Sequence, residues 1–309
     1  MPAPFPLSAE PRDHAAMKAR FVIAVVALAA LVLAFFATWQ QRNSLLGREP
    51  AAQTPAERPL DERAKAAVTS AAQPAVSAAT RRQAFETLKQ RAHGGDAVAQ
   101  RTLAETYNAC YMFNGARPQF LATYKPDEPP IAGDPQDAVL KQVARRRIAQ
   151  CDAVEGGAPF PAQNAQEWYD RAEANGDLAA RVMRYTRQGQ PLDGTESARL
   201  VEDVVASDDP AAVFAFGDLL SRRAVAGTDK AYEGLSVGPL TGMAWRVAAC
   251  RMGHDCGPES RHVDNLCLFQ RNCRAEGLEV SLRAGLKTQE EREALDGQVE
   301  VVLALLETV

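Results

Sequence analysis

Four of the chain's six cysteines and two of its four histidines lie in one short segment, CRMGHDCGPESRHVDNLCLFQRNC, residues 250–273. Thiolates and imidazoles in such a cluster could bind zinc or support redox chemistry, and the cysteines could instead be joined as structural disulfides. Zinc sites, redox centres and disulfides each have a typical spacing of cysteines along the sequence. The choice also depends on the compartment, because disulfides persist only in oxidising surroundings.

Zinc could use several side chains of this segment, namely Cys250, His254, Cys256, His262 and Cys267. Structural zinc sites usually contain two close pairs such as C-x2-C, whereas the cysteines here are separated by five, ten and five residues. A thioredoxin-type centre needs C-x-x-C and c-type haem needs C-x-x-C-H, and the segment contains neither. We therefore expect structural disulfides, with no bound metal and no cofactor.

The compartment is indicated by an apolar segment near the N-terminus, FVIAVVALAALVLAFFATW, Phe21–Trp39. It carries no charge over nineteen residues, and at about 1.5 Å per residue it is long enough to cross a bilayer. A cleaved signal peptide is the alternative, but the run is long for such a peptide and no small-x-small cleavage site follows closely. The sequence predicts an uncleaved transmembrane helix over residues 21–39.

The positions of the basic residues and cysteines predict the orientation of this helix. Arg12, Lys18 and Arg20 precede the span, and fewer basic residues follow it closely, which favours a cytoplasmic tail at residues 1–20. All six cysteines follow the span, as expected for an oxidising compartment. Residues 40–80 are rich in alanine and proline and predict a disordered linker. We expect a single-pass protein of a bacterial inner membrane, with residues 81–309 forming a periplasmic domain.

Helix boundaries restrict the disulfide pairing. AWRVAACRMG has helical spacing and ends at Gly253, and the next helix is predicted from Glu259, with Pro258 in its first turn. A bridge from Cys256 to Cys267 would span about 16 Å of helix, which exceeds the reach of a disulfide. The favoured pairs are Cys110–Cys151, Cys250–Cys256 and Cys267–Cys273. Cys250–Cys267 with Cys256–Cys273 stays open if the helices cross tightly.

Three segments after the linker share one pattern: GDAVAQRTLAETY from Gly95, GDLAARVMRY from Gly176 and DDPAAVFAFGDLL from Asp208. Each begins at a turn-forming residue, and an alanine follows four positions later, at Ala99, Ala180 and Ala212 respectively. Small residues at this spacing let two antiparallel helices approach closely. Composition also favours helices, since Ala, Leu, Arg and Glu recur. We expect an all-α domain of antiparallel helix pairs.

The stretches WYDRAEANGDLAA and HGGDAVAQRTLAETY resemble the Sel-one-like repeat, a relative of the tetratricopeptide repeat. The resemblance covers roughly residues 83–223, with an interruption over 112–161, and it implies a short α-solenoid that binds protein partners. A helical bundle without true repeats is the alternative. The overall layout also resembles bacterial membrane-anchored envelope proteins, a likeness that brings no function with it.

The sequence also predicts the structure of three further segments. The interruption YMFNGARPQFLATYKPDEPPIAGDP is rich in proline and glycine and is expected to loop out. The run Arg145-Arg146-Arg147 is interpreted as a solvated helix face. Near the C-terminus, Thr288 and Glu291 form a capping box ahead of a closing helix that is apolar over residues 299–306.

We expect a binding module without catalytic activity. H-E-x-x-H, S-x-x-K and phosphate-binding glycine loops are absent. The alternative is a cell-wall enzyme of the lytic transglycosylase type, with Glu259 of the PES fragment as its general acid. A net charge of −4 gives no reason to expect nucleic acid. The expected partners are an envelope protein and, through the N-terminal helix, the membrane.

Overall fold

The computed structural model describes residues 76–188, 194–222, 238, 240–273 and 276–307. The predicted cytoplasmic tail, the membrane span Phe21–Trp39 and most of the linker lie outside these residues. Within them, no helix combines the length and the apolar character that a membrane crossing requires. The described residues all belong to one compact unit.

The described residues form twelve α-helices and one short 3-10 helix and contain no strand, which confirms the predicted all-α class. The helices are α3 (Ala78–His93), α4 (Ala97–Gly115), α5 (Arg117–Tyr124), α6 (Pro135–Cys151), α7 (Gln163–Ala174), α8 (Leu178–Gln188), α9 (Gly194–Val205), α10 (Pro210–Arg222), α12 (Thr241–Arg251), α13 (Arg261–Gln270), α14 (Leu278–Ala284) and α15 (Gln289–Glu307), with the 3-10 helix at Val154–Gly157.

The same turn precedes α4, α8 and α10. Its first residue has a positive φ, at Gly95, Gly176 and Asp208. An aspartate follows each time, and the carboxylate accepts a hydrogen bond from a backbone N–H in the first turn of the helix, over 2.9, 2.7 and 2.9 Å for Asp96, Asp177 and Asp209. The alanines predicted at the helix contacts, Ala99, Ala180 and Ala212, are at most 1% exposed.

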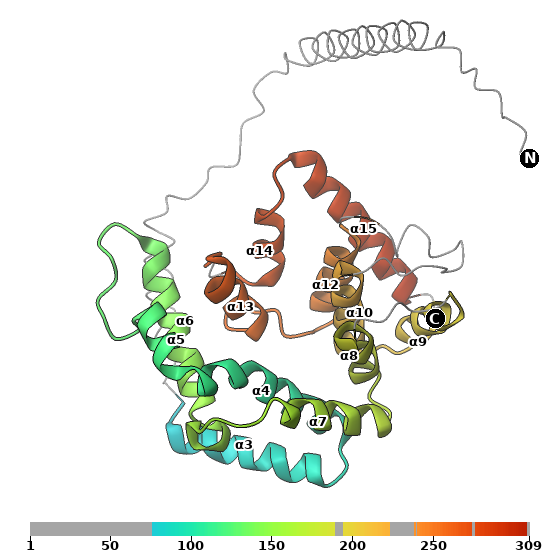
Figure 1. Ribbon diagram of the computed structural model, residues 1–309. Helices are drawn as coiled ribbons and strands as arrows, with labels where there is room; N and C mark the ends of the chain where they lie inside the picture. The colour runs from blue at the N-terminus through green and yellow to red at the C-terminus, as the bar shows by residue number, and fades with distance from the viewer. Residues whose placement is uncertain (1–75, 189–193, 223–237, 239, 274–275, 308–309) are drawn as a thin grey trace, which may run out of the picture. The chain divides into compact units, whose positions relative to one another are not determined.

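Helices that are near one another in the sequence pack together (Figure 1). The α4 helix packs against α3 and α7, α10 packs against α8 and α12, and α15 packs against α12. The α13 helix comes late in the chain and contacts both α6 and α14. Segments that are more than a hundred residues apart in sequence therefore meet at α13.

The buried apolar side chains form two cores. The N-terminal core includes Phe85, Leu103, Tyr107, Phe113, Leu140, Trp168, Tyr169, Cys267 and Leu268. The C-terminal core includes Val182, Leu200, Phe216, Leu219, Trp245, Val263, Leu295, Val299 and Val302. Because Val263 belongs to one core and Cys267 and Leu268 to the other, α13 contributes to both.

Several predicted boundaries need correction. Order begins before Arg81, because Ser77 caps a helix that starts at Ala78. The interruption does not loop out as a whole: its first residues continue α4, and α5 occupies Arg117–Tyr124. The residues between α5 and α6, 125–134, are the part that is not helical.

The predicted capping box is confirmed, since Thr288 N–H donates to Glu291 and Glu291 N–H donates to Thr288, both over 3.1 Å.

Candidate functional site

All six cysteines are paired in the structure, and no described cysteine is free. The pairs are Cys110–Cys151, Cys250–Cys256 and Cys267–Cys273, with Cα–Cα distances of 5.2, 5.5 and 4.2 Å. These are the pairs favoured by the spacing. The first joins α4 to the end of α6, and each of the other two ties the end of one helix to the loop that leaves it.

The segment between Cys250 and Cys256 is a tight turn that presents His254. Gly253 has φ 104°, and His254 N–H donates to the carbonyl of Ala249 over 2.9 Å, which closes the end of α12. The following helix starts at Arg261, two residues later than expected, because Ser260 caps it and accepts from Val263 N–H. Pro258 therefore lies before the first turn, not in it.

His254 and His262 come together across this loop. Their Nε2 atoms are 3.2 Å apart, and both rings lie against Phe214 of α10, at centroid distances of 4.3 and 4.1 Å. Burial lowers the pKa of His254, and it lowers that of His262 to about 2 with the help of Arg261. Both imidazoles are therefore neutral at pH 7, and one ring can donate to the other.

Beside the histidines, a chain of ion pairs joins α13 to α4 and α8. Arg261 binds Glu105 over 3.0 Å. Arg101, one turn before Glu105 on α4, binds Asp177 at the start of α8 over 2.9 Å and lies 3.5 Å from Glu105. The side chains of Glu105 and Arg101 are only 15% and 10% exposed. Burial raises the pKa of Glu105, but Arg261 and Arg101 outweigh this and leave it below its usual value. Glu105 is therefore ionised and paired, unlike a general acid.

Arg145 is exposed, but Arg146 and Arg147 do not lie on the solvated face that the sequence indicated. Arg147 is 1% exposed, and its guanidinium donates to Asn265 Oδ1 over 3.2 Å. Arg146 binds Asp264, whose side chain is fully buried. The interpretation was wrong because Asp264 lies on α13, which packs against α6 from a distant part of the sequence.

Glu259 does not occupy the position that the enzyme alternative requires. Its side chain is 68% exposed and pairs with Arg146 over 3.4 Å. The enzyme alternative requires a buried general acid, and an exposed carboxylate that is paired with an arginine is not buried. Glu259 also precedes Ser260, the cap of α13, so the helix does not begin at Glu259 as predicted.

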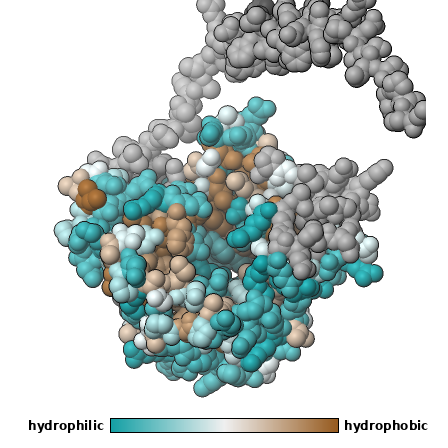
Figure 2. All heavy atoms as spheres, viewed as in Figure 1, coloured by the Kyte–Doolittle hydropathy of each residue, from teal (hydrophilic) through white to brown (hydrophobic). Residues whose placement is uncertain are grey.

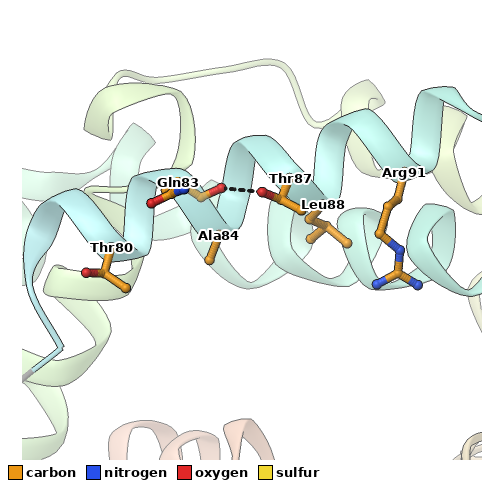
Figure 3. Close-up of a pocket in the computed structure, with 6 residues that line it drawn as sticks. All are labelled: Thr80, Gln83, Ala84, Thr87, Leu88 and Arg91. Atoms are coloured by element: carbon orange, nitrogen blue, oxygen red, sulfur yellow. Dashed lines mark hydrogen bonds between the residues drawn. The ribbon is translucent and has the colours of Figure 1, made fainter.

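A hollow on α3 offers little chemistry. The six residues in Figure 3 line a shallow hollow, and all belong to α3. Its one charged side chain, Arg91, already binds Asp96 over 2.6 Å. No group of three or more His, Cys, Asp or Glu side chains in the described residues is arranged to hold a metal ion.

An aromatic strip lies on the opposite end of α13 from the histidines. Phe269 is 62% exposed, its ring lies 6.4 Å from that of Phe113, and Phe113, Phe120 and Tyr124 follow one another at 4.4 and 4.5 Å. Tyr124 Oη donates to the carbonyl of Leu268 over 2.8 Å. Hydrophobic surface gathers in Figure 2 where Figure 1 places α13. We call these four residues the aromatic strip.

Sequence reasoning missed the ion pairs and the strip. Arg101 and Glu105 are four residues apart on a helix, a spacing typical of a surface pair, and their partners Asp177 and Arg261 lie far away in sequence. The aromatic residues of α5 were assigned to a loop. A helical reading of RPQFLATY, with proline near its start, would have placed Phe120 and Tyr124 on one face.

Comparison with known proteins adds no relative. The chain matches no protein-family model, and neither curated proteins nor solved structures show significant similarity to it.

Proposed function

We propose that this protein is a membrane-tethered module of the bacterial cell envelope that binds a protein partner through Phe269, the exposed end of the aromatic strip. The apolar segment at residues 21–39 would anchor it to the inner membrane, and residues 40–75 would link the anchor to the helical domain. The domain would be periplasmic, built of helix pairs in the manner of Sel-one-like repeats. The recurring turns before α4, α8 and α10 support this reading.

The observation that carries the proposal is the exposure of Phe269 on a rigid support. The Phe269 side chain is 62% exposed. A partner that covered it would remove this apolar surface from water, and that removal favours binding. The Cys267–Cys273 disulfide and the Tyr124–Leu268 hydrogen bond fix the backbone on either side. A preformed aromatic surface loses little conformational entropy on binding and is typical of the centre of a protein interface.

The test is site-specific photocrosslinking in intact cell envelopes. A photoreactive residue replaces Phe269 in one protein and Val301 in another; Val301 is also an exposed apolar residue, at 52%, but lies on α15. We expect a discrete crosslinked protein at position 269 and none at 301. The purified partner should then bind the wild type and the Val301→Ser variant, and bind Phe269→Ser at least tenfold more weakly. Equal crosslinking at both positions, or equal binding by both variants, would contradict the proposal.

The location is tested separately. Three disulfides in the structure support an oxidising compartment. Alkaline phosphatase needs its own disulfides, so a fusion after Val309 should be active, whereas a reporter that works only in the cytoplasm should be silent at the same position. The reverse pattern would place the domain in the cytoplasm and remove the envelope from the proposal.

A further inference from the structure

The histidine pair is left unused by the proposed function, and its geometry matches that of two ligands on one metal ion. Imidazole nitrogen binds zinc at about 2.0–2.1 Å, so two such ligands on a tetrahedral ion lie about 3.3 Å apart. The Nε2 atoms of His254 and His262 are 3.2 Å apart. A neutral imidazole pair in a hydrogen bond has a similar separation, so the distance admits both arrangements.

Several independent features hold the two rings in this arrangement. Phe214 lies against both. The Cys250–Cys256 disulfide encloses the turn that carries His254, and the Ser260 cap fixes the first turn of α13, where His262 lies. Both histidines are partly exposed, so water can reach the pair and complete a coordination sphere. Preorganised ligands of this kind lose little entropy when an ion binds.

We propose that His254 and His262 together bind one divalent transition-metal ion, with water in the remaining positions. All described cysteines are in disulfides, so imidazole is the nitrogen or sulfur ligand that this segment can offer. Imidazole suits Zn²⁺, Ni²⁺ and Cu²⁺ and not Mg²⁺ or Ca²⁺. The Irving–Williams order places Cu²⁺ above Ni²⁺ and Zn²⁺ in affinity.

The surrounding charges set the expected strength of binding. Arg261 lies next to His262 in sequence, and Arg246 and Arg147 are also close enough to act on its charge. Glu105 and Asp255 act on His254 in the opposite sense. With two protein ligands and several arginines nearby, we expect dissociation constants on the order of micromolar for Cu²⁺ and weaker ones for Zn²⁺. An ion of this kind would be exchangeable, unlike a buried structural zinc.

The experiment titrates Cu²⁺ and Zn²⁺ into the full chain, purified in detergent without a histidine tag. Isothermal titration calorimetry should show one Cu²⁺ per chain in the wild type, with at least tenfold weaker binding in His254→Gln and in His262→Gln. The His14→Gln, His93→Gln double variant is the matched control, since His93 also packs against an aromatic ring, Trp168 at 4.9 Å. It should bind as the wild type does, and Mg²⁺ should not bind to any of the proteins.

Two readouts keep the result independent of folding defects in the variants. Electron paramagnetic resonance of the wild-type Cu²⁺ complex should show hyperfine coupling to two nitrogen nuclei, and Zn²⁺ should raise the Tm of the wild type but of neither single variant. Absence of saturable binding to the wild type would leave the pair as a hydrogen bond and overturn the proposal. Binding that survives both substitutions, or that is lost in the control, would overturn it as well.

Discussion

The two cores of the helical domain are held together in different ways. In the C-terminal core, α10 and α12 approach so closely that a Cβ on Gly242 would lie 2.6 Å from the carbonyl oxygen of Gly217. The N-terminal core has no comparable glycine contact among its described residues. Its helices are joined by the Cys110–Cys151 disulfide and by aromatic rings such as Tyr107 and Phe85, which meet edge to face at 6.0 Å.

The two cores are stabilised differently because their helices bring different groups into contact. The α10 and α12 helices approach closely and pack Phe216 against Trp245, both fully buried, and no disulfide joins these two helices. The N-terminal core is smaller and is completed by α13, a helix from the far end of the sequence. Covalent and ionic links replace packing where the chain has to bring distant segments together. The α13 helix is thus the element on which both cores depend.

The largest expected effect comes from breaking the ion pair between α6 and α13. The Asp264→Ala change leaves Arg146 and Arg147 without a buried counter-charge and should cost about 3–5 kcal/mol. Glu259→Ala is the control: it removes an exposed partner of the same Arg146 and should change the free energy of unfolding by less than about 1 kcal/mol. Equal losses in the two variants would contradict the buried role of Asp264.

The same variant tests whether α13 couples the cores. Trp168 belongs to the N-terminal core and Trp245 to the C-terminal core, so proteins in which Trp39 and one of these two are replaced by phenylalanine report each core separately by fluorescence. In urea, the two probes should report one transition in the wild-type background and two separate transitions with Asp264→Ala. Coincident transitions in both backgrounds would show that other contacts couple the cores.

The next largest effect is the loss of stability on removing a disulfide, which should be greater for the long-range disulfide than for the two local ones. Cys110 and Cys151 are 41 residues apart, whereas the other pairs are 6 residues apart. Loop-closure entropy alone predicts a loss of about 4 kcal/mol when the first pair is replaced by alanines and about 2.4 kcal/mol for either of the others. Chemical denaturation of the three double variants measures this. Larger losses for the short loops would mean that they act through the native state, by holding helix ends.

Enlarging Gly242 tests the packing of the C-terminal core. A methyl group there would meet the Gly217 carbonyl oxygen at 2.6 Å and the Ser221 backbone nitrogen at 2.7 Å, and backbone atoms have little room to yield. We expect Gly242→Ala to cost about 3 kcal/mol. Gly297→Ala is the matched control on α15, where a Cβ would meet nothing within 4 Å. Its higher helix propensity should stabilise the protein by about 0.5–1 kcal/mol.

Local signals predicted much of the fold. The alanines at the helix contacts, the capping box at Thr288 and the ends of α12 and α13 depend on residues within one or two turns. Helix length also restricted the disulfide pairing, because it excludes a Cys256–Cys267 bridge, although it left Cys250–Cys267 with Cys256–Cys273 open. The recurring Asp caps were also visible in the sequence, one residue after each turn-forming position.

What the sequence did not predict depends on contacts between distant segments. The burial of Arg146 and Arg147 is set by Asp264, which is more than a hundred residues away. Nothing in a short arginine run separates a solvated face from one covered by a later helix. The sequence did not predict the histidine pair for the same reason: both rings pack against Phe214, which lies on the distant helix α10.

The smallest expected effect concerns a tyrosine of the N-terminal core. Burial, and then the negative charge of Glu105, raise the pKa of Tyr169 to about 12. The unfolded chain has a tyrosine pKa of about 10, so the folded state retains the phenolic proton more tightly. The associated stability is fully present below pH 10 and is lost as the pH rises from 10 towards 12. By pH 11 this group alone should lower the free energy of unfolding by about 1 kcal/mol.

Comparison with Tyr169→Phe isolates that loss from other alkaline effects. The difference in free energy of unfolding between wild type and Tyr169→Phe should shift by about 1 kcal/mol against the wild type between pH 9 and pH 11. If Tyr169→Phe keeps the wild-type dependence on pH, the phenol is not shielded by the N-terminal core. That core would then open to water more readily than its disulfide and ion pairs imply.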